Sequence, residues 1–529
     1  MASPDVELRV QDEAEHSASE TSVDVAKQQV PLLRYILALF TAALLIFLAG
    51  YDFFASASAL PVIGARLRKL STVNWVVVAY MLPLAVLMPS VTKLAAVCGR
   101  RPVLLVFGLF HLAGSAMSGA ADSMPLLLAG RAIAGIGAAG TAIIPIMAVA
   151  ETGTVAQQTL GLRILLAVWL VGSVVGLAAG GHLATVKHWR WVFYFDLPFL
   201  GLALPLSAMA IRLPAQDRPG LVQGLKRVDG LGMLFATGAM LTLVLGLNYG
   251  GNLFKWSSGV VITLLILALV LCVVFVFVEA KIAKEPMVPP SMFGSRASAA
   301  LTAMQPLIGV ATYAPIVYLI LWYSTVKGQS VANTSEHMLA VAIAMLVAAA
   351  VAEADLALVG RCRPLIRLVP LFLALGAGLL IILKQDTGAG IPAIFMALVG
   401  IGAGLSLQPQ FITLHKASRQ PMASIVASVM FLRLTGAVVA IALCNAVLQT
   451  NLSTKLAETI LRHPLFAKYI LDSVDNTDVI RLSSVPQSVR DDVLSVNVDA
   501  FRNAFIACFV LAAVAIPLLA LVRRASAAA

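Results

Sequence analysis

The sequence predicts an all-α membrane protein with fourteen transmembrane helices, and three of its properties lead to that fold class. First, 60% of its 529 residues are hydrophobic and only 12% are charged, and the mean hydropathy of +0.93 lies far outside the range of soluble globular chains. Second, the apolar residues gather in runs of about 20, the length that crosses about 30 Å of hydrocarbon. Third, the runs show no strand alternation, and in lipid each segment must satisfy its own backbone amides, so the runs are helices.

These apolar runs follow one another along the whole chain. They lie at 35–60, 75–97, 102–120, 125–149, 162–183, 190–212, 228–248, 257–280, 297–323, 338–358, 366–384, 389–414, 422–449 and 500–522. Residues 1–33 are polar and acidic, which predicts a disordered cytoplasmic tail and no signal peptide. The long connection 450–499 has mixed charge and is expected to form an outer loop.

The distribution of Lys and Arg predicts the side of the membrane that each loop faces. An even number of helices returns the C-terminus to the side of the N-terminus. That side carries roughly twenty Lys and Arg and the other roughly eight, so the positive-inside rule makes both termini cytoplasmic. This asymmetry explains most of the formal charge of +11, and no nucleic-acid partner is predicted. Two N-x-S/T sequons, Asn333 and Asn451, fall on predicted outer loops and are candidate glycosylation sites.

Asp52 is the main candidate functional residue because it lies deep inside the first apolar run. A charged side chain at mid-bilayer costs about 2.5 to 3.5 kcal/mol, so it usually faces a bundle interior or a wet cavity. A carboxyl group in a partly dehydrated cavity binds a proton more readily than one in water. Asp52 is therefore either a proton site or a carboxylate that only pairs with a neighbouring helix.

The energy source can be inferred from motifs that the sequence lacks. It contains no G-x-x-x-x-G-K-[ST] loop for nucleotide phosphates, no H-E-x-x-H and no G-x-S-x-G. The GxGxxG at Gly135, Gly137 and Gly140 lies inside an apolar helix, where close helix packing explains it better than a dinucleotide site. No enzyme activity, cofactor or metal is predicted. The remaining energy source is coupling to an ion gradient.

A short motif recurs in the two halves of the chain. GRRPVLL begins at Gly99 with Arg100 and Arg101, and GRCRPLI begins at Gly360 with Arg361 and Arg363, both on predicted inner turns. This recurrence favours an internal duplication. It divides the chain into a tail (1–33), a six-helix bundle (34–213), two inserted helices (214–288) and a second six-helix bundle (289–529).

Several motifs together resemble the fourteen-helix drug:proton antiporter branch of the major facilitator superfamily. Asp52 precedes Ala59-Leu60-Pro61 with that branch's spacing, and Leu94, Ala95, Gly99, Arg100 and Arg101 match the superfamily's loop signature. Thr92, Ala96 and Val97 depart from it, which puts the family's inner charge gate in doubt.

Arg131, Gly135 and Gly137 resemble the fourth-helix pattern. Gly172, Gly176, Gly180 and Gly181 resemble the antiporter signature of the fifth helix, with Leu177 replacing a proline. WRWVFYFDLP, at 189–198, has Asp196 where Asn is usual.

Other charged residues in or beside the predicted helices have expected roles of their own, and the resemblance also implies a substrate cavity. Arg131 either tunes the proton affinity of a carboxylate or extends to the interface, and its distance from Glu151 excludes that partner. Arg433 either binds an anionic substrate group or caps a helix end. Glu353 and Asp355 are expected to pair with Arg361 or Arg363. The expected substrate cavity includes Tyr80, Tyr313, Tyr318, Trp322, Gln408, Gln410 and Arg433.

The expected function is proton-coupled export of an amphipathic organic compound, such as a drug, toxin or secondary metabolite, by alternating access. The partners are this compound, protons and the bilayer, and the chain is expected to be a monomer in the plasma membrane, with the vacuolar membrane as the alternative. Uptake of a siderophore-like or nutrient molecule is the first rival. A receptor or scaffold that does not transport is the second.

Overall fold

The computed structural model describes residues 32–152, 154–184, 188–210, 229–358, 362–475, 479, 481–482 and 485–524. Within these ranges, fourteen helical spans are long and apolar enough to cross a membrane, which confirms the predicted fold class. Residues 1–31 of the predicted tail and the motif residues Gly360 and Arg361 lie outside the described residues.

The helices succeed one another without intervening sheets in the described part of the chain. The first group is α2 (Leu32–Leu67), η1 (Leu70–Thr72), α3 (Trp75–Cys98), α4 (Arg100–Gly119), α5 (Met124–Ala150), α6 (Val155–Leu183), α7 (Trp191–Tyr194) and α8 (Asp196–Ala210). Next come α10 (Gly230–Tyr249), α11 (Gly259–Phe277), η2 (Val278–Ile282) and η3 (Pro290–Phe293). The last group is α12 (Arg296–Trp322), η4 (Tyr323–Lys327), α13 (Val331–Leu358), α14 (Cys362–Leu379), η5 (Leu380–Ile382), α15 (Ile391–Leu405), α16 (Gln408–Ser418), α17 (Met422–Arg462), η6 (Pro464–Phe466), α18 (Ala467–Asp472), α19 (Gln487–Ala513) and α20 (Ala515–Arg524).

Three of the predicted spans are broken into two helices. In each, the first helix ends four residues before a proline, namely Pro198 for α7 and α8, Pro409 for α15 and α16, and Pro517 for α19 and α20. A proline cannot donate to the carbonyl four residues earlier, and its ring crowds that carbonyl. The break before Pro198 matters for function because it makes Asp196 the first residue of α8.

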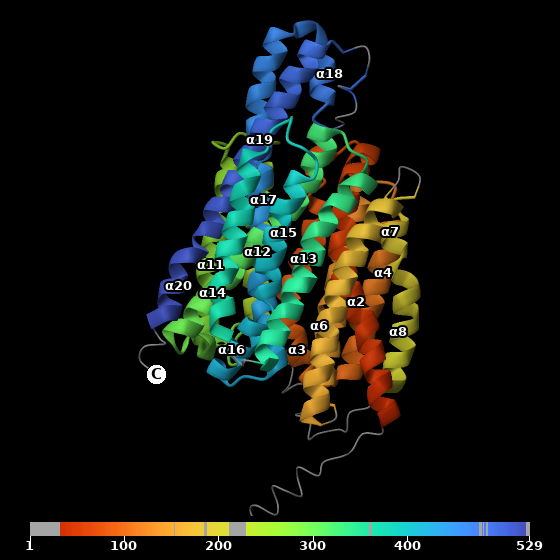
Figure 1. The fold of residues 1–529 in the computed structure, drawn as a ribbon, viewed down its shortest axis with the longest axis vertical. Coiled ribbons are helices and arrows are strands. Elements are labelled where there is room, and N and C mark those ends of the chain that lie inside the picture. The colour runs from red at the N-terminus through yellow and green to blue at the C-terminus, as the bar shows by residue number, and fades with distance from the viewer. Residues whose placement is uncertain are drawn as a thin grey trace, which may run out of the picture.

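The predicted outer loop 450–499 is largely helical, so the loop prediction was wrong. Helix α17 is 41 residues long and ends at Arg462. At 1.5 Å per residue it extends far beyond the bilayer. Together with α18 and the start of α19 it forms a cap at one end of the bundle (Figure 1). An apolar-run search stops where polar residues begin, although the helix continues. We call this end of the molecule the α18 end.

Both sequons also lie in helices rather than in loops, which corrects their predicted location. Asn333 belongs to α13 and Asn451 to α17. The side chain of Asn451 already has two partners, because its Nδ2 donates to the Val447 carbonyl at 2.7 Å and its Oδ1 accepts from Asn503 Nδ2 at 2.7 Å.

The first and last groups of helices lie side by side and meet mainly along three helix pairs. Helices α2 to α8 form one side and α12 to α20 the other (Figure 1). The pairs are α6 with α13, α3 with α17, and α2 with α12. Helix α10, which lies between the two groups in the sequence, packs against α11, α17 and α3. It therefore touches both groups.

The glycine stripe of α6 brings this helix against α2, which carries Asp52. A Cβ atom at Gly176 would lie 2.6 Å from the carbonyl oxygen of Tyr51, and one at Gly180 would lie 2.6 Å from Cα of Ala55. Gly172 faces the same helix, whereas Gly181 faces α13. Because glycines four residues apart allow backbones to approach closely, the stripe fixes the position of the α2 segment around Asp52.

We expect Gly176→Val to destabilise the protein because its branched side chain would have to separate α6 from α2. Overpacking of this kind costs about 1 to 3 kcal/mol. Thermal unfolding of the purified protein in detergent would report this as a lowered midpoint. Gly201→Val is the matched control, since no atom lies within 4 Å of a Cβ at Gly201. Equal midpoints for the two variants would contradict the packing role.

Candidate functional site

Asp52 of α2 forms a buried ion pair with Arg131 of α5. Oδ1 of Asp52 lies 2.7 Å from Nη1 of Arg131, and the two residues are 2% and 0% exposed. Arg131 Nε also donates to the Val76 carbonyl at 3.3 Å, and Ser56 Oγ donates to Asp52 Oδ1 at 3.3 Å. Removing one partner of a buried pair costs about 3 to 5 kcal/mol. Neutralising Asp52 would therefore strongly disfavour this arrangement.

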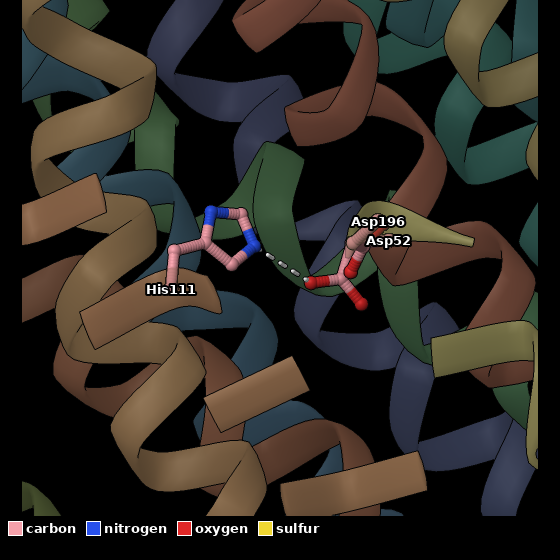
Figure 2. A group of neighbouring side chains, drawn as sticks. All are labelled: Asp52, His111 and Asp196. Atoms are coloured by element: carbon pink, nitrogen blue, oxygen red, sulfur yellow. Dashed lines mark ion pairs between the residues drawn. The ribbon is translucent and has the colours of Figure 1, made fainter. Parts of the chain in front are cut away.

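Two further titratable residues complete the cluster. His111 of α4 places Nε2 3.6 Å from Asp52 Oδ2 and Nδ1 3.0 Å from Thr141 Oγ1. Asp196 of α8 is buried, and its Oδ2 accepts a hydrogen bond from Ser115 Oγ at 2.9 Å. Asp52, His111 and Asp196 each offer one ligand atom within 4.8 Å of the others (Figure 2). We call Asp52, His111, Arg131 and Asp196 the acidic cluster.

The acidic cluster fits a proton better than a metal ion. The three ligand atoms are close enough together to hold a metal. However, the guanidinium of Arg131 already occupies Asp52 Oδ1. The fixed positive charge of Arg131 would repel a metal ion held by these ligand atoms, and this repulsion is strong in a medium of low dielectric constant. A proton only needs one free carboxylate oxygen.

Several buried polar atoms of this region have no hydrogen-bond partner. They are Asp52 Oδ2, the Tyr80 hydroxyl, His111 Nε2, Arg131 Nη2 and Asp196 Oδ1. Buried polar atoms are usually paired, and a group of exceptions calls for an explanation. Tyr80 belongs to this group because its ring centroid lies 4.2 Å from Cζ of Arg131. Unused donors and acceptors side by side allow the hydrogen bonds to rearrange without a large penalty.

A cavity of about 170 Å³ lies between the two helix groups, next to the acidic cluster. Aliphatic, methionine and phenylalanine side chains line most of it, and its polar lining residues are Tyr80, Trp169, Tyr313 and Gln408. Tyr80 is thus shared by the cavity and the acidic cluster. Phe53, next to Asp52, packs edge-on against Tyr313 with the ring centroids 4.8 Å apart, which joins α2 to α12 across the cavity.

A second polar cluster surrounds Arg433 of α17. Its Nη2 donates to Gln305 Oε1 at 2.8 Å and to Gln410 Oε1 at 3.3 Å, and Gln305 Nε2 donates to Gln410 Oε1 at 2.9 Å. Arg433 is 4% exposed, and no carboxylate among the described residues forms an ion pair with it. The adjacent Leu434 lines the cavity. A buried cation with only neutral partners is costly and attracts an anion.

Comparisons with known proteins identify the family of this chain. The family model described as Major Facilitator Superfamily matches residues 42–441. The chain belongs to the Major Facilitator Superfamily. Among its relatives are an MFS-type transporter of Claviceps purpurea (28% identical, covering 96% of this chain and 90% of the relative) and the efflux pump dotC of Dothistroma septosporum (27%, 90% and 81%). Another is the efflux pump aflT of Aspergillus parasiticus (26%, 82% and 85%).

Solved structures of this superfamily share the fold. A bacterial homolog of the human lysosomal transporter Spinster matches with a TM-score of 0.57 at 16% identity, covering 94% of this chain and 98% of that one. A bacterial homologue of the human drug peptide transporters PepT1 and PepT2 matches with a TM-score of 0.55 at 16% identity, covering 93% and 99%. As a member of this superfamily, the protein is a multi-pass integral membrane protein and a secondary transporter, not an enzyme.

The superfamily's loop motif forms the turn between α3 and α4. Gly99 has φ = 92°, a conformation that favours glycine. Arg100 pairs with Glu151 at the end of α5, while Arg101 is exposed. Burial raises the pKa of Glu151, and the Arg100 guanidinium acts in the opposite direction. Thr92, Ala96 and Val97 differ from the superfamily's signature near this turn. Lys93 lies among them, and its Nζ donates a hydrogen bond to the Pro286 carbonyl at 3.0 Å.

Some of the expected cavity residues lie elsewhere. The Tyr318 hydroxyl donates to the Ile441 carbonyl at 2.6 Å, which fixes α12 to α17. Trp322 lies at the far end of α12, where Lys327 Nζ is 5.8 Å from its ring centroid. Gln410 faces Arg433 and does not line the cavity. Sequence alone gives the helix on which a residue lies but not the face of that helix.

The expected partners of Glu353 also differ from those in the structure. Glu353 Oε2 lies 3.0 Å from Nε of Arg163, so the pair joins α13 to α6 rather than to the turn that follows α13. Arg361 and the side chain of Arg363 lie outside the described residues. Nothing in the sequence distinguishes Arg163, because the contact depends on how the two helix groups dock.

Polar contacts close the α18 end of the interface between the two helix groups. Asn248 Oδ1 of α10 accepts from Asn74 Nδ2 and from Asn445 Nδ2, each at 2.9 Å. Ser71 Oγ donates to Asp475 Oδ1 at 2.8 Å. The cavity instead reaches the opposite end, where its lining includes Met422, the first residue of α17. The structure is therefore closed at the α18 end.

We expect Asn248→Leu to loosen the α18 end, because two buried hydrogen bonds to the flanking helices are lost, each worth about 0.5 to 1.5 kcal/mol. A membrane-impermeant maleimide should then label Val73→Cys, at a buried position beside Asn74, several-fold faster. Asn252→Leu, at an exposed position after α10, is the control. An unchanged labelling rate in Asn248→Leu would show that α10 does not hold this end closed.

Proposed function

We propose that this protein is a proton-coupled exporter of an amphipathic organic compound. The observation that carries the proposal is the buried Asp52–Arg131 pair, held beside a cavity that is mainly apolar. A cavity with this mainly apolar lining suits an organic molecule with a few polar groups. Its relatives dotC and aflT are named efflux pumps, which supports export as the direction of transport.

Proton coupling follows from the chemistry of the pair. A proton on Asp52 removes its negative charge and releases Arg131, whose guanidinium lies against the ring of Tyr80. Tyr80 lines the cavity, so a shift of Arg131 changes the surface that a bound compound contacts. Conversely, a compound that displaces Tyr80 alters the proton affinity of Asp52. The proton and the compound then favour different conformations of the transporter, which is required if one is to be exchanged for the other.

The proposed arrangement in the membrane follows the distribution of Lys and Arg along the chain. The α18 end faces outward and both termini face the cytoplasm, so the cavity opens to the cytoplasm in this structure. The plasma membrane is the proposed location, with the vacuolar membrane as the alternative, and the transporter acts as a monomer. Residues 34–213 and 289–529 form the two bundles that rock against each other, and 214–288 hold the two inserted helices.

Transport of two dyes by purified protein in vesicles would test this proposal. Fluorescein is an amphipathic carboxylate and rhodamine 6G an amphipathic cation. We expect a pH gradient to drive at least one of them across the membrane in the direction opposite to the protons. Movement in the same direction as the protons would favour uptake. Absence of any dye or proton flux, with these dyes and with extracts that contain fungal metabolites, would favour a receptor or scaffold.

A further inference from the structure

Asp196 is a second buried carboxyl group, and its surroundings differ from those of Asp52. It is 0% exposed. Its Oδ2 accepts one hydrogen bond, from the neutral hydroxyl of Ser115 at 2.9 Å, and its Oδ1 has no partner. No Lys, Arg or His in the described ranges lies within ion-pair distance of it. An ionised carboxylate in such a place would be a buried charge without compensation.

The charges of the neighbouring helices do not compensate it. The titratable groups around Asp196 come from four helices: Tyr51 and Asp52 from α2, Tyr80 from α3, His111 from α4 and Arg131 from α5. The single permanent cation among them, Arg131, is bonded to Asp52. Two carboxylates with oxygens within 4.8 Å of each other repel strongly, so both do not stay ionised in a buried site.

His111 is a poorer place for the compensating proton. Its Nδ1 is next to Thr141 Oγ1, and Nε2 is 3.6 Å from Asp52 Oδ2. A protonated His111 would give Asp52 a second cation and leave Asp196 ionised with only the Ser115 hydroxyl. A proton on Asp196 instead leaves one carboxylate and one guanidinium, which are already paired. The O–H of a neutral Asp196 would also lie near the carboxylate of Asp52, whose Oδ2 has no hydrogen bond in the structure.

We propose that Asp196 is a proton-binding site of this transporter and that it is protonated in the conformation seen here, while Asp52 is ionised. This inference rests on the proposed proton coupling and assigns it a second carrier. The carboxylate of Asp196 takes up one proton from the water on one side of the membrane and forms an O–H bond. When Arg131 moves from Asp52 toward Asp196, this proton passes to Asp52, so that Asp52 becomes the neutral acid and Asp196 the paired anion. Asp52 releases the proton to the water on the other side when Arg131 returns to it.

Infrared spectroscopy of the full-length protein in lipid vesicles tests the protonation state without a transported compound. The wild type should show an absorption band of a buried, protonated carboxyl group that persists at neutral pH. Asp196→Asn, which has the shape of the neutral acid and can keep the Ser115 hydrogen bond, should remove it. Asp122→Asn, which removes an 87% exposed carboxylate, should leave it. A band unchanged in Asp196→Asn would overturn the proposal.

Two additional measurements keep the result decisive. If Asp196→Asn does not fold, Ser115→Ala should shift the band to higher frequency, because the acid loses its hydrogen-bond donor, and an unmoved band counts against Asp196. Titration with ZnCl₂ should show no binding that depends on Asp196 and His111. Zinc binding abolished by Asp196→Asn and His111→Ala would overturn the proton site in favour of a metal site.

Dye transport separates this inference from the proposed function. If the wild type moves dye against protons and Asp196→Asn does not, while Asp122→Asn does, both are supported. If Asp196→Asn keeps full coupling, Asp196 is not a carrier, although the proposed function stands. If the wild type shows no proton-linked transport, the proposed function fails even where the infrared band still identifies Asp196 as protonated.

Discussion

Asp52→Asn should abolish proton-driven accumulation of dye. With the membrane potential held at zero, exchange of one proton per dye molecule lets a pH difference of one unit support a dye gradient of about tenfold, because one pH unit is equivalent to about 1.4 kcal/mol. An amide cannot take up a proton, so the variant should reach a ratio of about one. The measurement is the steady-state dye ratio across vesicles that contain equal amounts of protein.

Folding and coupling must be distinguished in this experiment, because Asp52→Asn leaves Arg131 buried without its anion. The double variant Asp52→Asn with Arg131→Gln removes both charges and avoids the penalty of an unpaired cation. It should remain folded and uncoupled. Asp52→Glu keeps an acid and should retain part of the gradient. Full accumulation by Asp52→Asn would remove Asp52 from the mechanism.

The sequence was sufficient to predict the number of transmembrane spans because composition and run length report directly on the lipid environment. It was not sufficient for helix ends, since the polar continuation of α17 beyond the membrane is still helical. The three broken spans have a local cause that the sequence does contain, namely Pro198, Pro409 and Pro517. Other prolines, such as Pro145 within α5, leave the helix continuous, so the position of a break also depends on packing.

The candidate site shows a similar division. Asp52 and Arg131 stand out in the sequence because charges are rare in apolar runs, and the structure brings them together. Asp196 and His111 carry the same signal, a titratable side chain within an apolar run, but their proximity to Asp52 depends on the docking of α4 and α8 against α2 and α5. The sequence thus marks Asp196 and His111 individually as titratable residues inside predicted spans, but it does not show that they lie beside Asp52.

The second large effect is expected at Arg433. Its partners in the described structure are the neutral side chains of Gln305 and Gln410, so Arg433→Met leaves no buried opposite charge and should fold. If Arg433 provides the positive charge for an anionic group of the transported compound, this variant should lose efflux of fluorescein by about ten- to a hundredfold, since hydrogen bonds to charged groups contribute about 1.5 to 3 kcal/mol. Efflux of rhodamine 6G, which has no carboxylate, should change little.

The comparison of two dyes in one variant separates recognition from general damage. A misfolded transporter loses both dyes together, whereas loss of an anion site affects fluorescein alone. Lys416→Met removes a positive charge that is exposed on α16 and controls for a general effect of charge on the entry of anions. If Arg433→Met and Lys416→Met reduce fluorescein efflux equally, the long-range field and not a binding site is responsible. If Arg433→Met transports both dyes normally, the guanidinium serves to hold α12, α16 and α17 together through the two glutamines.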